Sequence, residues 1–501
     1  MADSNHINNL PDGLLLEIFT YLPLIDRKTA SQVCRLWDQE AFSARLMTSV
    51  RLRISCTMLN SKARSLELLR NSSRPYRNIM ITLCGSGACN DIQYEFIVTV
   101  LDLFGKSIES FTMIRGCSAA QFKDFVVRMP GLKHVTAYVT EPDKRPVESL
   151  VFPVLGKLRE VDLEINNDDV LESGQLDVLG MAPNVTQLGI TFDKCDEPVQ
   201  VIDLLEVCAE QLTSLDLFVP HDRIPIDELQ LGKLEVLKLR GRAFSYDNNK
   251  LYLLFKGLPA LKEVHLDFVV TESALRIVCS NCPKLEKLDI KTDILQEKSF
   301  KCLETLSNLQ VLIVNFINTS MIVGCKPLTS IKEMQIHVDD TYLNNHDYAE
   351  QMYRVFPNVR SMKIFFRGFR TKIIDEVFVR QICRTFVNLR KLTVSGEYCL
   401  YATVRGFDSP NDLGNVEEFI FIKTDFSIGP SSYTNRIKRL IFDHVNAIDI
   451  DVYSIDKFFP KLQYLEFVSC KEIKPDVIVK LRETFPRCVI HYVHLEKRWM
   501  Y

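Results

Sequence analysis

A short pattern of apolar residues recurs along most of this 501-residue chain. Each copy reads apolar, two variable residues, apolar, one variable residue, apolar. Successive copies start about 25 residues apart on average, so a repeat architecture is the first expectation for this chain. The fifteen copies begin at Ile108, Leu132, Leu158, Val185, Leu212, Leu234, Leu261, Leu285, Leu309, Ile331, Val359, Leu389, Val416, Ile437 and Leu462.

The spacing within each copy is typical of a strand, because its last two apolar residues are two apart and face the same side. Segments between copies have helical spacing instead, as at Leu275, Val278 and Cys279. One strand and one helix cannot bury a core alone, but stacked units bury a continuous one. We therefore predict an α/β solenoid of about fifteen repeats over residues 108–490, with a C-terminal tail at 491–501.

This pattern resembles the leucine-rich-repeat family over about three quarters of the chain. The resemblance implies a horseshoe whose strands line the concave face. Residues 49–107 are less regular, although they alternate like strands at 50–54 and 79–83 and are helical in character at 94–103. Two interpretations stay open for this segment, namely irregular first repeats or a cap.

The N-terminal segment predicts two short amphipathic helices separated at Pro23. The apolar stripe of the first consists of Leu14, Leu15, Ile18, Phe19 and Leu22. The stripe of the second, which Asp26 can cap, consists of Ala30, Val33, Cys34 and Trp37. Two helices of this size cannot form a stable core alone, so we expect their apolar surface to be shared with something else.

Residues 1–48 resemble an F-box, whose pattern is Leu-Pro, a Leu-rich helix with Ile-Phe and Leu, and a final Val-Cys-x-x-Trp. Gly13 departs from that pattern, because an acidic residue is usual there. The matching positions, which the resemblance assigns to adaptor binding, are Leu10, Pro11, Leu14, Leu15, Ile18, Phe19, Leu22, Val33, Cys34 and Trp37.

The F-box resemblance implies a function. The chain is expected to be the substrate-recognition subunit of an SCF-type ubiquitin ligase, binding a Skp-family adaptor directly and a cullin scaffold and RING subunit indirectly. Trp37 is the expected hot spot, and Trp37→Ala is expected to weaken adaptor binding by about 2–4 kcal/mol. Two alternatives stay open: a scaffold or binding protein that acts outside the ligase, and helices that merely pack on the first repeat.

The predicted concave face is mostly polar but becomes apolar near the C-terminus. An exposed apolar patch usually marks a binding site, so we expect a protein client there. A fold-back of His491, Tyr492, Leu495, Trp499 and Tyr501 over this face is the alternative. The predicted client-binding residues are Ile420, Ile422, Arg439, Ile441, Tyr464, Glu466 and Val468.

Composition argues against several other classes of function. The net charge of −3, without a basic run, argues against nucleic-acid binding. We expect no membrane span and no secretory signal, and hence a cytoplasmic and/or nuclear protein with its fifteen cysteines reduced. A single C-x-x-C, Cys279 and Cys282, lacks the second pair of a zinc site. No catalytic motif is recognisable, so we expect no catalytic residue, metal or cofactor.

Overall fold

The structure is a computed structural model that falls into two compact units, Met1–Ala243 and Phe244–Tyr501. It describes residues 10, 12–72, 74–83, 89–141, 154–165, 182–192, 205–218, 229–241, 248–292, 295, 297–338, 347–367, 376–398, 403–404, 413–427, 436–445, 448–449, 455–470 and 473–493.

The first unit begins with a small helical domain. Its elements are α1 (Asp12–Thr20), α2 (Leu24–Ala30), α3 (Arg35–Ala41) and the 3₁₀ helix η2 (Leu46–Ser49). The predicted second helix was wrong, because the chain forms two helices there. Cys34 is extended, with φ −161° and ψ 171°, and this residue separates α2 from α3.

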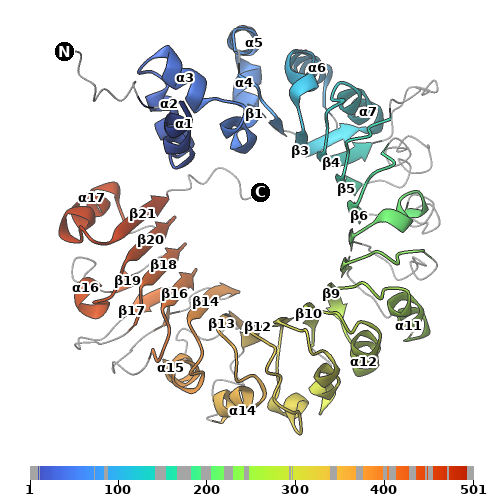
Figure 1. Ribbon diagram of the computed structural model, residues 1–501, viewed down its shortest axis with the longest axis vertical. Helices are drawn as coiled ribbons and strands as arrows, with labels where there is room; N and C mark the ends of the chain where they lie inside the picture. The colour runs from blue at the N-terminus through green and yellow to red at the C-terminus, as the bar shows by residue number, and fades with distance from the viewer. Residues whose placement is uncertain are drawn as a thin grey trace. The chain divides into compact units, whose positions relative to one another are not determined.

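A ladder of parallel strands, paired in chain order, forms the rest of the first unit. Its helices lie on one side of the ladder (Figure 1). The strands are β1 (Arg51–Ser55), β2 (Asn78–Thr82), β3 (Ser110–Ser118), β4 (His134–Glu141), β5 (Glu160–Ile165), β6 (Gln187–Phe192), β7 (Ser214–Phe218) and β8 (Val236–Arg240). The helices are α4 (Cys56–Asn60), α5 (Lys62–Arg70), α6 (Asp91–Phe104) and α7 (Ala119–Val127), with 3₁₀ helices η3 (Gly105–Ser107) and η4 (Ala209–Gln211).

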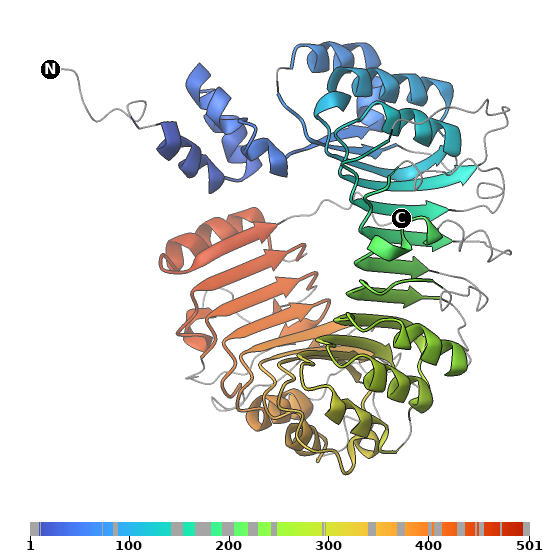
Figure 2. The same ribbon diagram turned by 45° about the vertical axis from the view of Figure 1, so that its right-hand side comes forward.

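The second unit contains a second parallel ladder, again paired in chain order (Figure 2). Its strands are β9 (Glu263–Val269), β10 (Lys287–Lys291), β11 (Val311–Val314), β12 (Glu333–Val338), β13 (Ser361–Arg367), β14 (Lys391–Tyr398), β16 (Glu418–Ile422), β18 (Arg439–Asp443), β20 (Tyr464–Val468) and β21 (Val489–Val493). A small sheet of β15 (Thr403–Val404), β17 (Asp425–Ser427) and β19 (Ile448–Asp449) accompanies it.

The helices of the second unit lie on one side of its ladder (Figure 1). They are α11 (Asn248–Lys256), α12 (Glu272–Asn281), α14 (Tyr348–Val355), α15 (Glu376–Thr385), α16 (Ile455–Phe458) and α17 (Pro475–Thr484), with the 3₁₀ helices η6 (Ser299–Thr305) and η7 (Thr319–Ile322).

The register of the strands confirms the predicted α/β solenoid. Equivalent positions of successive sequence copies pair directly, as Leu288 does with Leu312 and Met334 with Met362. In all fifteen copies the last two apolar positions lie on a strand and are buried. The core is therefore a set of stacked apolar rows, one side chain per repeat, between the strands and the helices.

Both ends of the predicted solenoid needed adjustment. β1 and β2 pair in parallel with each other and with β3, so the segment 49–107 supplies two further strands to the ladder and is part of the repeat array. The predicted helix at 94–103 lies within α6. At the other end β21 pairs with β20 as far as Val493, so the ladder continues beyond the expected boundary at residue 490.

Candidate functional site

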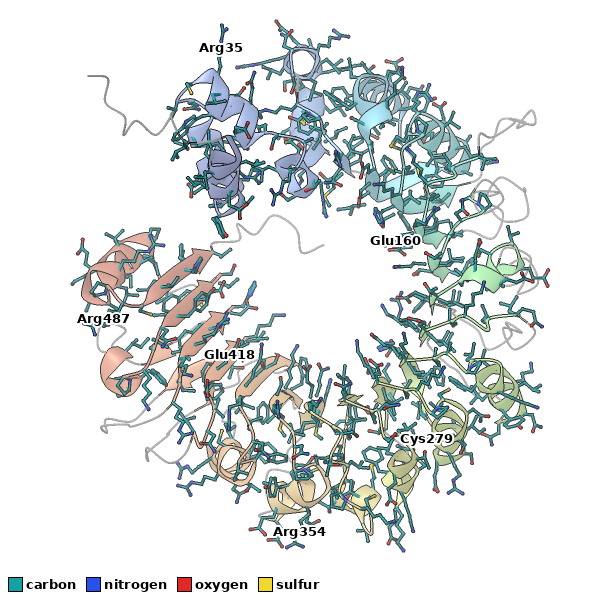
Figure 3. The ribbon with its side chains drawn as sticks, viewed as in Figure 1. Arg35, Glu160, Cys279, Arg354, Glu418 and Arg487 are labelled. Atoms are coloured by element: carbon teal, nitrogen blue, oxygen red, sulfur yellow. The ribbon has the colours of Figure 1, made fainter. Side chains whose placement is uncertain are left out.

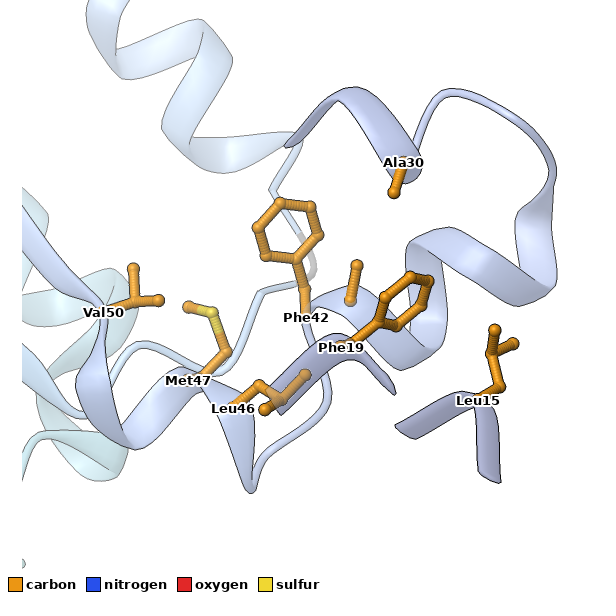
Figure 4. Packing of buried hydrophobic residues seen from close by; sticks show 8 residues of the cluster. Leu15, Phe19, Ala30, Phe42, Leu46, Met47 and Val50 are labelled. Carbon is orange, nitrogen blue, oxygen red and sulfur yellow. The ribbon is translucent and has the colours of Figure 1, made fainter. Parts of the chain in front are cut away.

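The small helical domain has a compact core of its own. Trp37 and Leu22 pack against this core, and both are half-buried. The buried cluster, shown in Figure 4, consists of Leu15, Phe19, Ala30, Ala41, Phe42, Leu46, Met47 and Val50. The core therefore contains residues of η2 and Val50 as well as residues of α1–α3. These additional residues explain how the domain can have a core that two short helices could not form alone.

Two of the residues predicted to bind the adaptor lie in this core. Leu15 and Phe19 are 2% and 1% exposed, so neither can contact a partner while the domain is folded. Their assignment to the adaptor interface was wrong, because the same residues that match the F-box pattern also have to fill the interior. Trp37 packs edge-to-face on Phe19, with ring centroids 5.5 Å apart.

The remaining predicted residues include three that are exposed. Leu14, Ile18 and Val33 are between 43% and 61% exposed. Tyr21 and Ile25 are more exposed still and were missed, although Leu14, Ile18 and Tyr21 follow the i, i+4, i+7 spacing of one helical face. We name these five side chains the docking stripe. They are large apolar groups left in contact with solvent by a domain whose core is otherwise filled.

Two other predicted positions are partly exposed. Leu10 and Cys34 are half-buried, and Cys34 occupies the position before α3. Pro11 lies outside the described residues.

Contacts with the first repeats hold the helical domain in place. The guanidinium of Arg74 lies 3.6 Å from the ring centroid of Phe42, a cation–π contact. The side-chain amide of Asn78, on β2, donates to the carbonyl oxygen of Thr48 at 2.6 Å. The docking stripe is thus presented by a domain fixed to the ladder through both its core and its polar contacts.

The second candidate surface is the strand face of the second unit. In Figure 3, Glu418 extends from β16 on this face, whereas Cys279 and Arg354 lie on the helix side. The predicted apolar residues here, Ile420, Ile422, Ile441 and Val468, are half-buried and alternate with the buried core residues. We name these four side chains the apolar patch.

The polar residues predicted beside the patch form a connected set. The guanidinium of Arg439 lies 4.5 Å from the ring centroid of Tyr464, whose hydroxyl donates to Glu466 at 3.0 Å. Arg439 also lies 4.0 Å from a carboxylate oxygen of Glu418, and Tyr464 stacks on His491 with centroids 5.3 Å apart. These contacts orient the polar groups, and burial together with the Glu466 hydrogen bond raises the pKa of Tyr464.

A hollow of about 360 Å³ adjoins the patch. Ile420 and Ile422 line one part of it, and Val311 and Ile313 of β11 line another. Lys363 and Lys391 lie between them. Val311 and Ile313 were not predicted from the sequence. Along the paired strands they occupy the outward-facing positions that Glu418 and Ile420 occupy in β16.

The proposed fold-back of the C-terminal tail is corrected in part. His491 and Tyr492 lie in β21 and pair with Glu466 and Phe467 of β20, so they belong to the ladder and not to a covering segment. Leu495, Trp499 and Tyr501 lie outside the described residues.

Among the residues that the structure describes, no group of three or more His, Cys, Asp or Glu side chains is placed to hold a metal ion. Within the same residues no helix has the length and apolar character needed to cross a bilayer.

Comparison with known proteins assigns the N-terminal domain. Residues 7–53 match the family described as F-box-like. No curated protein matches the chain. Two solved structures are similar at 12% identity: a TLR13–ssRNA13 complex, with TM-score 0.49 over 91% of this chain, and the yeast Rad7–Elc1 complex, with TM-score 0.38 over 82% of it. The alignments cover 64% of the matched chain in the TLR13–ssRNA13 complex and 88% of the matched chain in the Rad7–Elc1 complex. Residues 7–53 of the chain are therefore an F-box-like domain, and this domain is joined to an α/β solenoid of stacked repeats.

Proposed function

We propose that this protein is the substrate-recognition subunit of an SCF-type ubiquitin ligase. The observation that carries the proposal is the docking stripe, the set of exposed large side chains on a domain of the F-box-like family that has a buried core of its own. In this role the chain contributes no catalytic group, and it acts in the cytoplasm, the nucleus or both.

The docking stripe would bind a Skp-family adaptor. Leu14, Ile18 and Val33 are about half exposed, so burying the remaining surface of each stabilises a complex by about 1 kcal/mol. Tyr21 adds an aromatic ring, a residue type enriched among binding hot spots. The cullin scaffold and the RING subunit would then be reached through the adaptor, without direct contact with this chain.

The strand face of the second unit would hold the client. The apolar patch supplies area, and Arg439 with Glu466 supplies oriented polar groups. Holding a client at one site and the ligase scaffold at another raises the effective concentration of a client lysine at the charged ubiquitin carrier. This proximity is the whole of the proposed mechanism.

Adaptor binding is tested with a charge placed in the docking stripe. Ile18→Glu should weaken the affinity of the full chain for a purified Skp-family adaptor at least about 100-fold, because a carboxylate would be buried without a partner. Leu68→Glu is the matched control, since Leu68 is a 65% exposed leucine on α5, outside the stripe. Equal affinities for the two variants would refute the stripe as the adaptor site.

Client binding is tested on the other unit. Ile420→Glu and Ile441→Glu should abolish capture of proteins labelled by proximity in cells with the proteasome inhibited, whereas Val479→Glu, at an exposed valine on α17, should not. Ubiquitination of a captured client by the reconstituted ligase then separates a ligase subunit from a scaffold. A client that is bound but never modified would favour the scaffold.

A further inference from the structure

Two thiols from neighbouring repeats meet on the helix side of the second unit. Cys279 lies on α12, and its position on that side is labelled in Figure 3. Its Sγ is 3.5 Å from the Sγ of Cys302, on η6, to which it donates a hydrogen bond. Both cysteines are free thiols in this structure.

The repeat period explains why these two thiols meet. Cys279 and Cys302 are 23 residues apart in sequence, close to one repeat, so they occupy equivalent turns of stacked connections. The C-x-x-C neighbour of Cys279 behaves differently. Cys282 is fully buried, and burial raises the pKa of its thiol to about 12. The C-x-x-C motif of the sequence therefore does not contain the pair of thiols that meet in the structure.

The two thiols of the pair have unequal surroundings. Cys302 is half-buried, and the hydrogen bond from Cys279 holds the pKa of Cys302 below its usual value, with Arg276 acting in the same direction. Cys279 is 2% exposed, and the same hydrogen bond together with burial raises its pKa well above the usual value. Nearby Cys325, also half-buried, has a pKa raised to about 11, chiefly by burial.

We propose that Cys302 and Cys279 form a peroxide-sensitive modification site, in which Cys302 is the oxidised thiol and Cys279 resolves it to an intramolecular disulfide. The thiolate of Cys302 attacks one oxygen of hydrogen peroxide, the O–O bond breaks, and a sulfenic acid and hydroxide result. The sulfur of Cys279 then attacks Sγ of Cys302. The S–O bond breaks, and the released oxygen leaves as water with the proton from Cys279.

The reaction is balanced by the two thiols and peroxide alone. Two thiols lose two electrons in forming the S–S bond, and one peroxide is reduced to two waters once the hydroxide is protonated. The disulfide would join α12 to η6 and enclose β10 in a covalent loop. Because both thiols lie on the helix side, this inference is independent of the proposed client surface on the strand face.

Peptide mapping of the full-length oxidised chain tests the pairing. The wild-type protein is treated with hydrogen peroxide, its remaining thiols are alkylated, and it is digested with trypsin and Glu-C without reduction. The double digest separates Cys302 from Cys325, because cleavage follows Lys301 and Glu304. We expect the peptide 277–284 linked to the peptide 302–304, with the link retained in Cys282→Ser. Loss of the link in Cys282→Ser, or a different pair, would overturn the proposal.

Trapping of the sulfenic acid tests the order of the two steps. In Cys279→Ser, a dimedone-type reagent should label Cys302 after peroxide treatment, and labelling of Cys325 should stay at the level of the untreated protein. Cys325→Ser is the matched control and should form the link at the wild-type rate. If peroxide leaves Cys302 unlabelled in Cys279→Ser and both thiols alkylatable in the wild type, the site does not exist.

Discussion

Phe19 of α1 and Trp37 of α3 meet edge to face in the F-box-like domain, with ring planes 75° apart. Phe19 is fully buried, whereas Trp37 keeps part of its surface in solvent. Trp37 therefore serves the domain's own core whether or not it also contacts an adaptor. The resemblance alone assigned all of its energetic effect to adaptor binding.

Trp37→Ala should lower the local stability of the helical domain by about 2 kcal/mol, because a half-buried aromatic ring and its contact with Phe19 are lost. Amide hydrogen exchange over residues 12–50 of the full chain measures this effect. Ile18→Ala should leave exchange unchanged and weaken only adaptor binding, since Ile18 is exposed. Unchanged exchange in Trp37→Ala would show that the ring contact contributes nothing to the domain.

Gly13 is a second position where a substitution should change the stability of the helical domain. A Cβ placed on Gly13, in the first turn of α1, would meet no atom within 4 Å. Gly13→Glu should stabilise the domain by about 1 kcal/mol, because glycine is a poor helix former and an acid is favourable near a helix N-terminus. Gly13→Lys is the control, sharing the better propensity without the favourable charge. Slower exchange in the Glu variant than in the Lys variant is the expected result, and the reverse order would contradict it.

The fold was largely predictable because each repeat carries its own copy of the same signal. A strand position such as Leu288 needs an apolar side chain whatever its neighbours are, so fifteen copies reinforced one interpretation. One strand without a copy of the pattern was not predicted. This strand is β21, whose apolar residues Val489, Ile490 and Val493 do not follow the frame.

The sites were less predictable because apolar character does not distinguish interior from interface. Leu14 and Leu15 are adjacent leucines on one helix, yet Leu14 is exposed and Leu15 is buried. Both belong to one wide apolar sector, and only the positions of α3 and η2 decide which side is covered. The meeting of Cys279 with Cys302 likewise depends on how consecutive connections stack, and no local motif contains it.

Gly414 and Gly324 form a matched pair in the second unit. Both have positive φ, +52° and +72° respectively, so alanine is strained at either position. A Cβ on Gly414 would clash with the backbone oxygen of Cys383, whereas one on Gly324 meets nothing within 4 Å. Gly324→Ala should cost about 1–2 kcal/mol. Gly414→Ala should cost about 1–3 kcal/mol more, since backbone must move. Urea unfolding of the two variants measures the difference, and equal costs would show that the clash relaxes freely.

Ion pairs between consecutive repeats of the first unit predict that its folding stability depends on pH in the acid range. Glu109 lies 2.9 Å from the ammonium of Lys133 and 3.3 Å from Arg77, and the hydrogen bond from Lys133 holds the pKa of Glu109 below its usual 4.5. A depressed carboxyl pKa gives stability that is present above the unfolded-state value and is lost as pH falls through the folded-state value. Stability should therefore fall below about pH 4.5 and less steeply in Glu109→Gln. The difference should be under about 1 kcal/mol, because the side chains are 31% and 44% exposed. Urea midpoints between pH 3 and 6 provide the measurement, and parallel profiles would contradict it.

Asn315 holds together the ends of two neighbouring strands. Its side-chain oxygen, which follows β11, accepts from the backbone N–H of Thr292 at 2.5 Å and from the Thr292 hydroxyl at 2.9 Å. Thr292 is fully buried after β10, so Asn315→Ala leaves its backbone N–H without this acceptor and without access to water, whereas its hydroxyl can still donate to the carbonyl of Phe316. An unsatisfied buried donor costs about 1–3 kcal/mol, and we expect a loss of stability of this size. Hydrogen exchange in β10 and β11 should report this loss.

Asn308→Ala is the control. It removes only an exposed 3.5 Å contact to the carbonyl of Pro283 and should change stability by less than about 0.5 kcal/mol. Similar losses in the two variants would mean that burial, which distinguishes the two asparagines, does not set the strength of these bridges between repeats.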